Sequence, residues 1–216
     1  MQTVAEFVTS AAGADDFPRD RLPEVALVGR SNVGKSSLIN ALVRRPLART
    51  SAAPGKTRLA NFYRVHRGSS PPVYLVDLPG YGYARGGDAS AQEFNRLVDA
   101  YFARCGTGRE GRSDEDRRGG SSGPPTAIAV ILLVDSRHPG LESDLDAWSW
   151  LASQPCPRGV VGTKVDKLTR ADRTRHAREF ESLFQLPVPL VSARDGEGLD
   201  VLWKLIVKLP NPTAAP

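Results

Sequence analysis

The sequence predicts an α/β fold in which a mainly parallel sheet is covered by helices on both faces. Short apolar runs without polar alternation, such as residues 25–28 and 127–134, are typical of buried strands in a parallel sheet. They alternate with longer segments whose apolar residues recur every three or four positions, as in helices. In folds of this class a ligand binds at the carboxyl ends of the strands, so functional residues are expected there.

The chain begins with a polar N-terminal extension, residues 1–22. Its one apolar patch, residues 4–8, either packs at a sheet edge or stays loose. The strand at 25–28 is followed by a helix that begins near Lys35. A loop at 46–60, rich in Ser, Pro, Gly and Arg, is expected to be mobile because it shows no periodicity.

Two strands, at 61–66 and 73–76, are joined by a short turn, which favours an antiparallel pair. A glycine-rich loop at 78–90 follows them. The remaining elements are expected in this order: a helix carrying residues 94–101, a strand at 127–134, a helix at 141–151, a strand at 159–162, a helix that begins with the capping box of Thr169 and Asp172, a strand at 187–191 and a helix at 199–206.

The length suits one domain, which we place at residues 23–209 with a short tail at 210–216. Residues 105–125 hold almost nothing apolar and are expected to be a disordered surface insertion. No apolar run is long enough to span a bilayer, and the N-terminus lacks the pattern of a signal peptide. We therefore expect a soluble, cytoplasmic monomer without a membrane partner.

The two cysteines, Cys105 and Cys156, lack the spacing of a metal site and are interpreted as reduced thiols. The net charge of +5 is unevenly distributed: residues 30–76 contain nine Lys/Arg and no Asp or Glu, whereas elsewhere the acidic residues outnumber the basic ones. This basic block exceeds the needs of one nucleotide, so either a polyanionic partner such as RNA or a merely solvated face explains it. Its surplus residues are Arg44, Arg45, Arg49, Arg58, Arg64 and Arg67.

A glycine-rich motif, Gly29-x-x-x-x-Gly34-Lys35-Ser36, connects the first strand to the first helix. Glycines in this arrangement let backbone N–H groups surround a phosphate at the positive end of a helix. Lys35 is expected to reach the β- and γ-phosphates, and Ser36 to bind Mg²⁺. The nucleotide-binding residues expected here are Gly29, Arg30, Ser31, Asn32, Val33, Gly34, Lys35, Ser36 and Ser37.

The end of the strand at 73–76 carries Asp77-Leu78-Pro79-Gly80. Asp77 is suited to hold Mg²⁺ through a water, and the Gly80 N–H to face a γ-phosphate, so the loop beyond would sense that phosphate. In the loop at 46–60, Thr57 of the string Gly55-Lys56-Thr57 is expected to complete the Mg²⁺ shell in the triphosphate state, with Thr50 and Ser51 as competitors.

Two further motifs are expected to bind the base. Thr163-Lys164-Val165-Asp166 offers a carboxylate that accepts hydrogen bonds from both N1–H and the amine of guanine, and would repel N1 of adenine. The stem of Lys164 either lies along the purine or is simply solvated. At Val191-Ser192-Ala193 a backbone N–H could reach guanine O6, although Ser192 is better suited to shaping the turn. These residues favour GTP over ATP.

With these motifs in this order, the chain resembles translation-factor-type GTPases and is most similar to the EngB (YihA/YsxC) family of bacterial ribosome-assembly GTPases. The matching strings are residues 29–42, 47–51, 54–57, 61–62, 76–84 and 135–139, and the likeness runs from about residue 4 to residue 209. The tail Tyr81-Gly82-Tyr83-Ala84 is the most specific of them.

The resemblance implies a P-loop GTPase fold with a six-stranded mixed sheet and about five helices. It also implies a role in maturation of the large ribosomal subunit, through a basic surface that includes Arg44, Arg45, Arg49 and Arg58, and a link to normal cell division and septation. Two features depart from the family pattern: the insertion at 105–125 is longer and more polar, and Thr163 stands where GTPases usually carry Asn, which is expected to weaken the connection between the base-binding and phosphate-binding loops.

Hydrolysis is expected to be in-line attack of water on the γ-phosphate, with Lys35, Thr57 and Gly80 as the catalytic residues. Tyr81 occupies the position where many GTPases place a water-orienting glutamine, so slow turnover is expected, with the missing element supplied by a partner or by K⁺ held at Asn32. Asn32 could equally cap its own turn. The alternative function is a GTP-dependent binding module for a division or membrane-associated partner, and an ATP-driven motor is disfavoured by Asp166.

Overall fold

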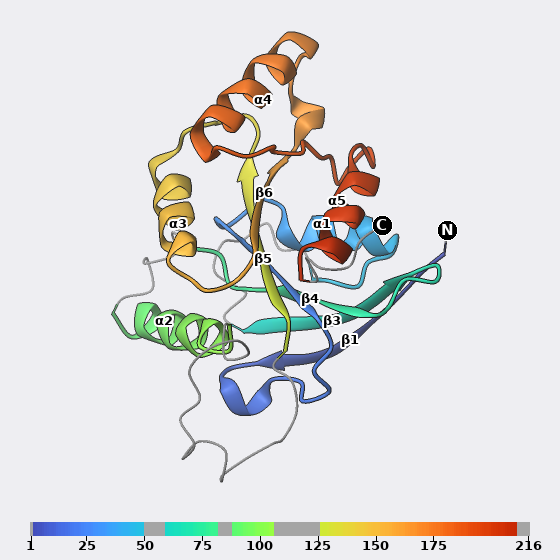
Figure 1. Ribbon diagram of the computed structural model, residues 1–216, viewed down its shortest axis with the longest axis vertical. Coiled ribbons are helices and arrows are strands. Elements are labelled where there is room, and N and C mark those ends of the chain that lie inside the picture. Colours follow the sequence, from blue (N-terminus) through green and yellow to red (C-terminus); the bar gives the residue numbers. More distant parts are fainter. Residues whose placement is uncertain (1, 50–58, 82–87, 106–125, 211–216) are drawn as a thin grey trace.

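The computed structural model describes residues 2–49, 59–81, 88–105 and 126–210. Over this part of the chain, six strands and five α-helices form an α/β fold (Figure 1). The strands are β1 (Thr3–Ala11), β2 (Glu24–Gly29), β3 (Ala60–Arg67), β4 (Val73–Asp77), β5 (Ile128–Asp135) and β6 (Arg158–Thr163), and the helices are α1 (Lys35–Val43), α2 (Asp88–Phe102), α3 (Glu142–Ala152), α4 (Arg170–Phe184) and α5 (Leu199–Lys208).

The six strands form one mixed sheet with the order β1-β3-β4-β2-β5-β6. The strands from β4 to β6 are parallel to one another, and β3 pairs antiparallel with both β4 and β1. Every residue of β2 and β5 is buried, which explains why these strands appear in the sequence as unbroken apolar runs. The mainly parallel sheet and the antiparallel pair at β3 and β4 are therefore confirmed.

The apolar patch at residues 4–8 packs at a sheet edge, which is one of the two alternatives that the sequence left open. It forms β1, which contributes the sixth strand, so the expected extension is part of the sheet. Three apolar side chains of this edge strand remain exposed: Val4, Phe7 and Val8. The register with β3 shifts between Phe7 and Thr9, so Val8 is the extra residue of a β-bulge.

The prediction of a strand at 187–191 is wrong. Only an isolated bridge joins Leu190 to Gly162 of β6. The Gly162 N–H donates to the Pro189 carbonyl (2.9 Å), and the Val191 N–H donates to the Gly162 carbonyl (2.7 Å). Pro187 and Pro189 have no N–H to donate, so this segment cannot extend a regular ladder.

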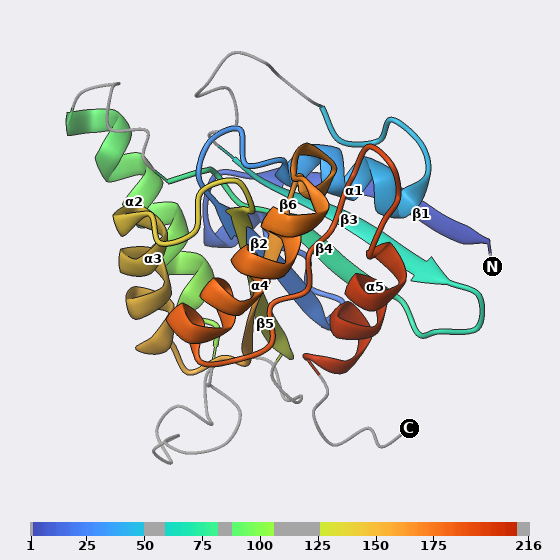
Figure 2. The same ribbon diagram turned by 90° about the horizontal axis from the view of Figure 1, so that it is seen from above.

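Helices cover both faces of the sheet (Figure 2). One face packs against α2, α3 and α4 through Tyr101, Leu151 and Phe180. The opposite face packs against α1 and α5 through residues such as Leu38 and Trp203. This arrangement leaves the carboxyl ends of β2, β4, β5 and β6 at one edge, where the described residues of the expected site lie.

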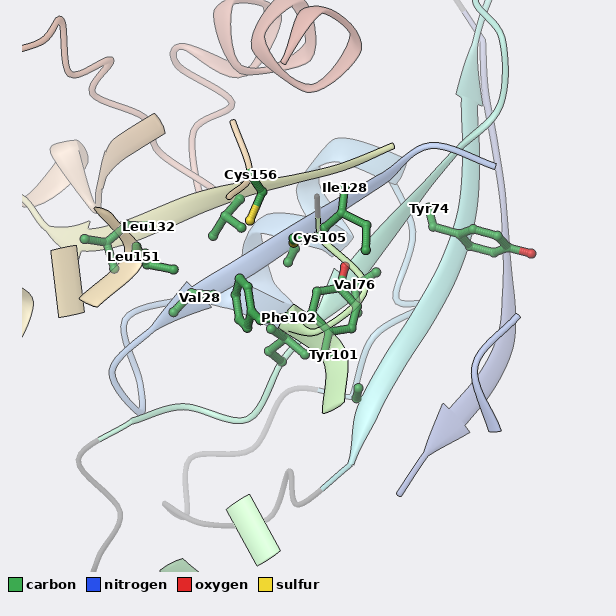
Figure 3. Packing of buried hydrophobic residues seen from close by; sticks show 14 of the residues in the cluster. Val28, Tyr74, Val76, Tyr101, Phe102, Cys105, Ile128, Leu132, Leu151 and Cys156 are labelled. Carbon is green, nitrogen blue, oxygen red and sulfur yellow. The ribbon is translucent and has the colours of Figure 1, made fainter. Parts of the chain in front are cut away.

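The two cysteines belong to the core cluster beneath α2 and α3 (Figure 3). Cys105 and Cys156 are both buried free thiols, in agreement with the sequence interpretation. They belong to the same cluster, and the nearby Cys156 thiol together with burial raises the pKa of Cys105. Cys105 follows α2, and Cys156 precedes β6.

Candidate nucleotide site

Residues 29–36, here called the phosphate loop, connect β2 to α1. Gly34 has φ +111°, in the region that side chains disfavour, and α1 begins at the next residue, Lys35. The Lys35 ammonium is buried and donates to the carbonyls of Gly29 (2.9 Å) and Arg30 (3.4 Å). Burial lowers the pKa of Lys35, and the nearby Asp77 carboxylate opposes that shift. An anion entering the loop would therefore meet a cation that is poorly compensated.

Asp77, at the end of β4, lies beside the start of α1. The Ser36 hydroxyl donates to Asp77 Oδ2 (2.8 Å), whereas Oδ1 is buried and has no hydrogen-bond partner among the described residues. Burial raises the pKa of Asp77, although Lys35 and Ser36 oppose this effect. A hydroxyl and a carboxylate in contact, with one carboxylate oxygen unsatisfied, fit the oxygen ligands that Mg²⁺ prefers.

Residues 77–81, here called the Asp77 loop, lie against the phosphate loop. A Cβ atom on Gly80 would stand 2.8 Å from the Ser31 nitrogen and 3.0 Å from the Lys35 ammonium, so no larger residue fits there without movement. The Ser31 N–H also donates to the Tyr81 carbonyl (3.4 Å). The structure thus places Gly80 beside Lys35, the side chain expected to bind phosphate.

On the other side of the phosphate loop lie residues 163–166, here called the base loop. The buried Thr163 hydroxyl donates to the Val33 carbonyl (2.8 Å). The Lys164 ammonium donates to the Asn32 carbonyl (2.7 Å) and to Asp135 Oδ2 (2.9 Å). The Thr163 side chain, although shorter than that of asparagine, thus reaches the phosphate loop directly, and a weaker connection than asparagine would give stays a prediction.

Asp166, the carboxylate expected to bind the base, is held in place by the chain segment that follows Leu190. The Ser192 hydroxyl donates to Asp166 Oδ1 (2.9 Å) and accepts from the N–H groups of Arg194 (3.2 Å) and Asp195 (3.0 Å). The Val165 N–H donates to the Val191 carbonyl (3.2 Å). Ser192 thus shapes the turn, as expected, and also orients Asp166.

Sequence reasoning missed two buried carboxylates beside the site. Asp135, at the end of β5, accepts from Lys164 and Arg137; burial works against ionisation, but these hydrogen bonds hold the pKa of Asp135 well below its usual range. Asp144, in the first turn of α3, accepts from Tyr81 and Arg30. The position of Asp135 at a strand end could have revealed it, whereas Asp144 lies in an ordinary helical pattern.

Several expected residues lie outside the described part of the chain: Gly55, Lys56, Thr57 and Arg58. Within the expected basic surface, Arg44, Arg45 and Arg49 are exposed at and beyond the end of α1. Arg64 and Arg67 instead face Glu6 (3.8 Å) and Asp200 (2.7 Å) across salt bridges. Acidic residues therefore offset part of the basic block.

The phosphate loop lies between a buried parallel strand, β2, and a helix, α1. The Thr163 hydroxyl connects it to the base loop, which carries Asp166 and follows β6, two strands away in the sheet. This is the arrangement of a P-loop GTPase fold. Solved structures agree. The chain is similar to Era of Aquifex aeolicus, solved with GDP and AlF4⁻ (TM-score 0.67, 20% identity), over 87% of this chain and 56% of that one. It also resembles NFeoB from S. thermophilus, solved with GDP, AlF4⁻ and K⁺ (TM-score 0.59, 21% identity), over 90% of this chain and 65% of that one.

Sequence comparison gives a narrower result. A family model described as a 50S ribosome-binding GTPase matches residues 24–115. Proteins named "Probable GTP-binding protein EngB" are similar over nearly their whole length: that of Pelotomaculum thermopropionicum is 41% identical over 94% of this chain and 93% of its own, and that of Solibacter usitatus 42% identical over 94% of each. The chain belongs to the EngB family. Among its described helices, none is long and apolar enough to cross a membrane.

Proposed function

We propose that this chain binds GTP and GDP and hydrolyses GTP. The observation that carries the proposal is the position of Asp166: its carboxylate is oriented by Ser192, and its loop is hydrogen-bonded to the phosphate loop through Thr163 and Val33. A base-reading carboxylate and a phosphate-binding loop are thus held as one unit, which suits a guanine nucleotide. The family name of its relatives supports the same conclusion.

The residues of the phosphate loop and the Asp77 loop supply the expected chemistry. The backbone N–H groups at the start of α1 face a phosphate, and the Lys35 ammonium stabilises negative charge that develops on the transferred group. Ser36 and Asp77 would hold Mg²⁺, which when bound neutralises phosphate charge. Burial of Lys35 strengthens its interaction with an anion because little water screens it.

Nucleotide selectivity tests this proposal. Calorimetric titration of the full chain should give GTP and GDP affinities at least about 100-fold higher than that for ATP. Asp166→Asn should remove the preference for guanine, because the amide replaces one of the two acceptor oxygens by an NH2 donor, which would face a donor of guanine. Asp195→Asn is the matched control, because Asp195 is exposed on the neighbouring turn. Equal affinities for GTP and ATP in the unmodified chain would exclude a guanine-specific site.

We further propose that the GTP-bound chain assists assembly of the large ribosomal subunit in the cytoplasm, with a consequence for cell division and septation. The exposed Arg44, Arg45 and Arg49 are suited to contact the phosphates of rRNA. The description of the matching family model is consistent with such a partner. Slow intrinsic turnover follows from Tyr81, whose phenol lacks the amide of the glutamine that orients water in other GTPases.

Sedimentation with large ribosomal subunits tests the partner. Replacing Arg44, Arg45 and Arg49 by glutamine should weaken binding and reduce its dependence on salt, because fewer counterions are released. The matched control replaces three exposed arginines of α4, namely Arg170, Arg175 and Arg178. If guanine nucleotides bind but no nucleotide state sediments with the subunit, the alternative of a GTP-dependent module for a division or membrane-associated partner is favoured instead.

The proposed K⁺ site rests on Asn32. This residue is exposed with φ +64°, and its carbonyl already accepts from Lys164, which leaves the side-chain amide as the group available to a cation. K⁺ near the phosphate loop would add positive charge where the γ-phosphate reacts. GTPase rates measured in K⁺ and in Na⁺ buffers decide the matter, since equal rates would exclude this role.

A further inference from the structure

One buried carboxylate connects the two loops that form the phosphate side of the site. Asp144, in the first turn of α3, accepts from the Tyr81 hydroxyl (2.7 Å) and from Arg30 Nε (3.1 Å), both at Oδ1. Arg30 lies in the phosphate loop, and Tyr81 directly follows Gly80. The Asp144 side chain is 3% exposed, and its Oδ2 has no hydrogen-bond partner in the described part of the chain. These bonds are therefore well shielded from water.

Tyr81 is held at both ends. Its carbonyl accepts from the Ser31 N–H of the phosphate loop, and its hydroxyl donates to Asp144. Tyr81 lines a cleft of about 560 Å³ between α2 and α3, bordered by residues such as Phe94 and Trp150, and packs in part against the core cluster. Because Tyr81 borders a cleft and is only partly packed, the hydrogen bond to Asp144 contributes to its position.

The position of Tyr81 determines that of Gly80. While Tyr81 stays bound, Gly80 lies so close to Lys35 and Ser31 that even a methyl group would not fit between them. A γ-phosphate that contacts the Lys35 ammonium would compete with Gly80 for part of that space. The triphosphate would then displace Gly80 from this position, and Tyr81 would follow because the two residues are adjacent in the chain.

We propose that Asp144 is a positioning residue that holds Tyr81 and Gly80 against the phosphate loop and so selects against the γ-phosphate. This inference rests on the proposed guanine-nucleotide site and deepens it. A diphosphate leaves Gly80 in place, whereas a triphosphate breaks the contact with Asp144. The contact between Tyr81 and Asp144 therefore raises the affinity for GDP relative to that for GTP. A ligand shifts a conformational equilibrium only when it binds the two conformations, here with the contact made or broken, with different affinity.

The protonation of the pair supports a stable contact. Burial and the adjacent Asp144 raise the pKa of Tyr81 well above its usual value, so the phenol keeps its proton and donates. Burial also raises the pKa of Asp144, and the hydrogen bonds from Tyr81 and Arg30 oppose this effect.

The test compares two affinities in the same variant. Tyr81→Phe keeps the ring but removes the hydroxyl, and it should increase the affinity for a non-hydrolysable GTP analogue about 10- to 100-fold relative to that for GDP, the effect of one hydrogen bond to a charged group. Calorimetric titration of the full chain measures both affinities. Asp144→Asn, which keeps an acceptor oxygen but removes the charge, should shift the ratio in the same direction by less.

Tyr74→Phe is the matched control. Tyr74 also donates its hydroxyl to an aspartate, Asp20 (2.9 Å), but on β4 at the opposite end from the site. This variant should leave the ratio unchanged.

The outcomes separate this inference from the proposed function. A chain that binds neither guanine nucleotide overturns both. If the unmodified chain binds both nucleotides and Tyr81→Phe and Asp144→Asn leave the ratio as it was, or weaken both affinities equally, Asp144 merely supports the fold and the inference is overturned. Because two variants are measured, a folding defect in one of them still leaves the other to decide.

Discussion

Each end of the sheet buries a carboxylate, but the two carboxylates differ in their hydrogen-bond partners. Glu24 opens β2 and is 1% exposed, and Asp77 closes the adjacent strand β4 and is 2% exposed. Two N–H groups of the Arg104 guanidinium donate to the two oxygens of Glu24, whereas Asp77 has one oxygen without a partner among the described residues. At the amino end both oxygens of the buried carboxylate are paired within the fold, although burial still raises the pKa of Glu24. At the carboxyl end the pairing is incomplete until a ligand binds.

The largest effect is expected from breaking the pair of Glu24 and Arg104. Arg104→Met would leave Glu24 buried without its counter-charge and should lower the free energy of unfolding by about 3–5 kcal/mol. Arg104 also stacks over Phe17 at 4.9 Å, a contact that methionine partly replaces. Urea denaturation measures the loss. Arg158→Met, which removes a similar stacking contact on Trp148 at 5.0 Å but no paired carboxylate, is the control. A loss no larger than that of the control would mean that Glu24 does not depend on Arg104.

A second prediction concerns the base side of the site. Asp166→Asn should lower GDP and GTP affinity by the same factor, about 100-fold, which corresponds to about 2.7 kcal/mol. The factor is expected to be the same because Asp166 is oriented by Ser192, and no hydrogen bond or ion pair of the described residues joins it to residues 77–81. Titration with both nucleotides measures it. Unequal losses would show that the base side senses the γ-phosphate.

Asp77 allows a prediction about pH. Its pKa is raised in the folded protein, so the folded state binds a proton more tightly than the unfolded chain. In the unfolded chain Asp77 ionises above its ordinary pKa of about 3.8, and this favours the unfolded state. The cost to the folded state grows as the pH rises toward the pKa that Asp77 has in the folded protein. Asp77→Asn removes the cost. The nucleotide-free variant should gain about 1 kcal/mol at neutral pH and nothing at the acidic end of the range.

Urea denaturation at several values between about pH 4 and about pH 8 checks this trend. The same variant should bind nucleotide more weakly in the presence of Mg²⁺, because it loses the charged oxygen ligand. A stability difference that is independent of pH would contradict the assignment of the cost to Asp77.

The smallest effect is expected at the junction of the two loops. Thr163→Val keeps the shape but leaves the Val33 carbonyl without its hydroxyl donor, so nucleotide affinity should fall about three- to fivefold, or about 1 kcal/mol. Thr174→Val on α4, whose hydroxyl makes only a long exposed contact with Arg170, should have no effect. Unchanged affinity in Thr163→Val would show that the two loops hold their positions independently.

The sequence predicted those parts of the molecule that depend on local pattern. The buried runs of β2 and β5 and the phosphate loop at Lys35 were found because strand composition and glycine placement are local signals. The segment at 187–191 was misread because its apolar residues resemble a strand, while its prolines remove the donors that pairing needs.

The contacts that complete the site were not predictable in the same way. Tyr81 and Asp144 are 63 residues apart, and Arg30 and Asp144 are 114 apart. Nothing in the pattern of α3 distinguishes Asp144 from an ordinary first-turn carboxylate, since acidic residues are favoured at that position for the helix itself. Thr163 shows the converse: its residue type was noted in the sequence, whereas the partner of its hydroxyl, the Val33 carbonyl, could be identified only in the structure.

The bulge in β1 has a consequence for how molecules of this protein behave toward one another in concentrated solution. An edge strand presents unpaired backbone groups, and Val4, Phe7 and Val8 would add an apolar surface to that edge. A flat strand with these properties is a template for pairing with the same strand of a second copy. Because Val8 is the extra residue, the edge bends at its centre and a long continuous ladder between copies is interrupted. The irregularity thus protects the chain against aggregation at the edge of its sheet farthest from β6.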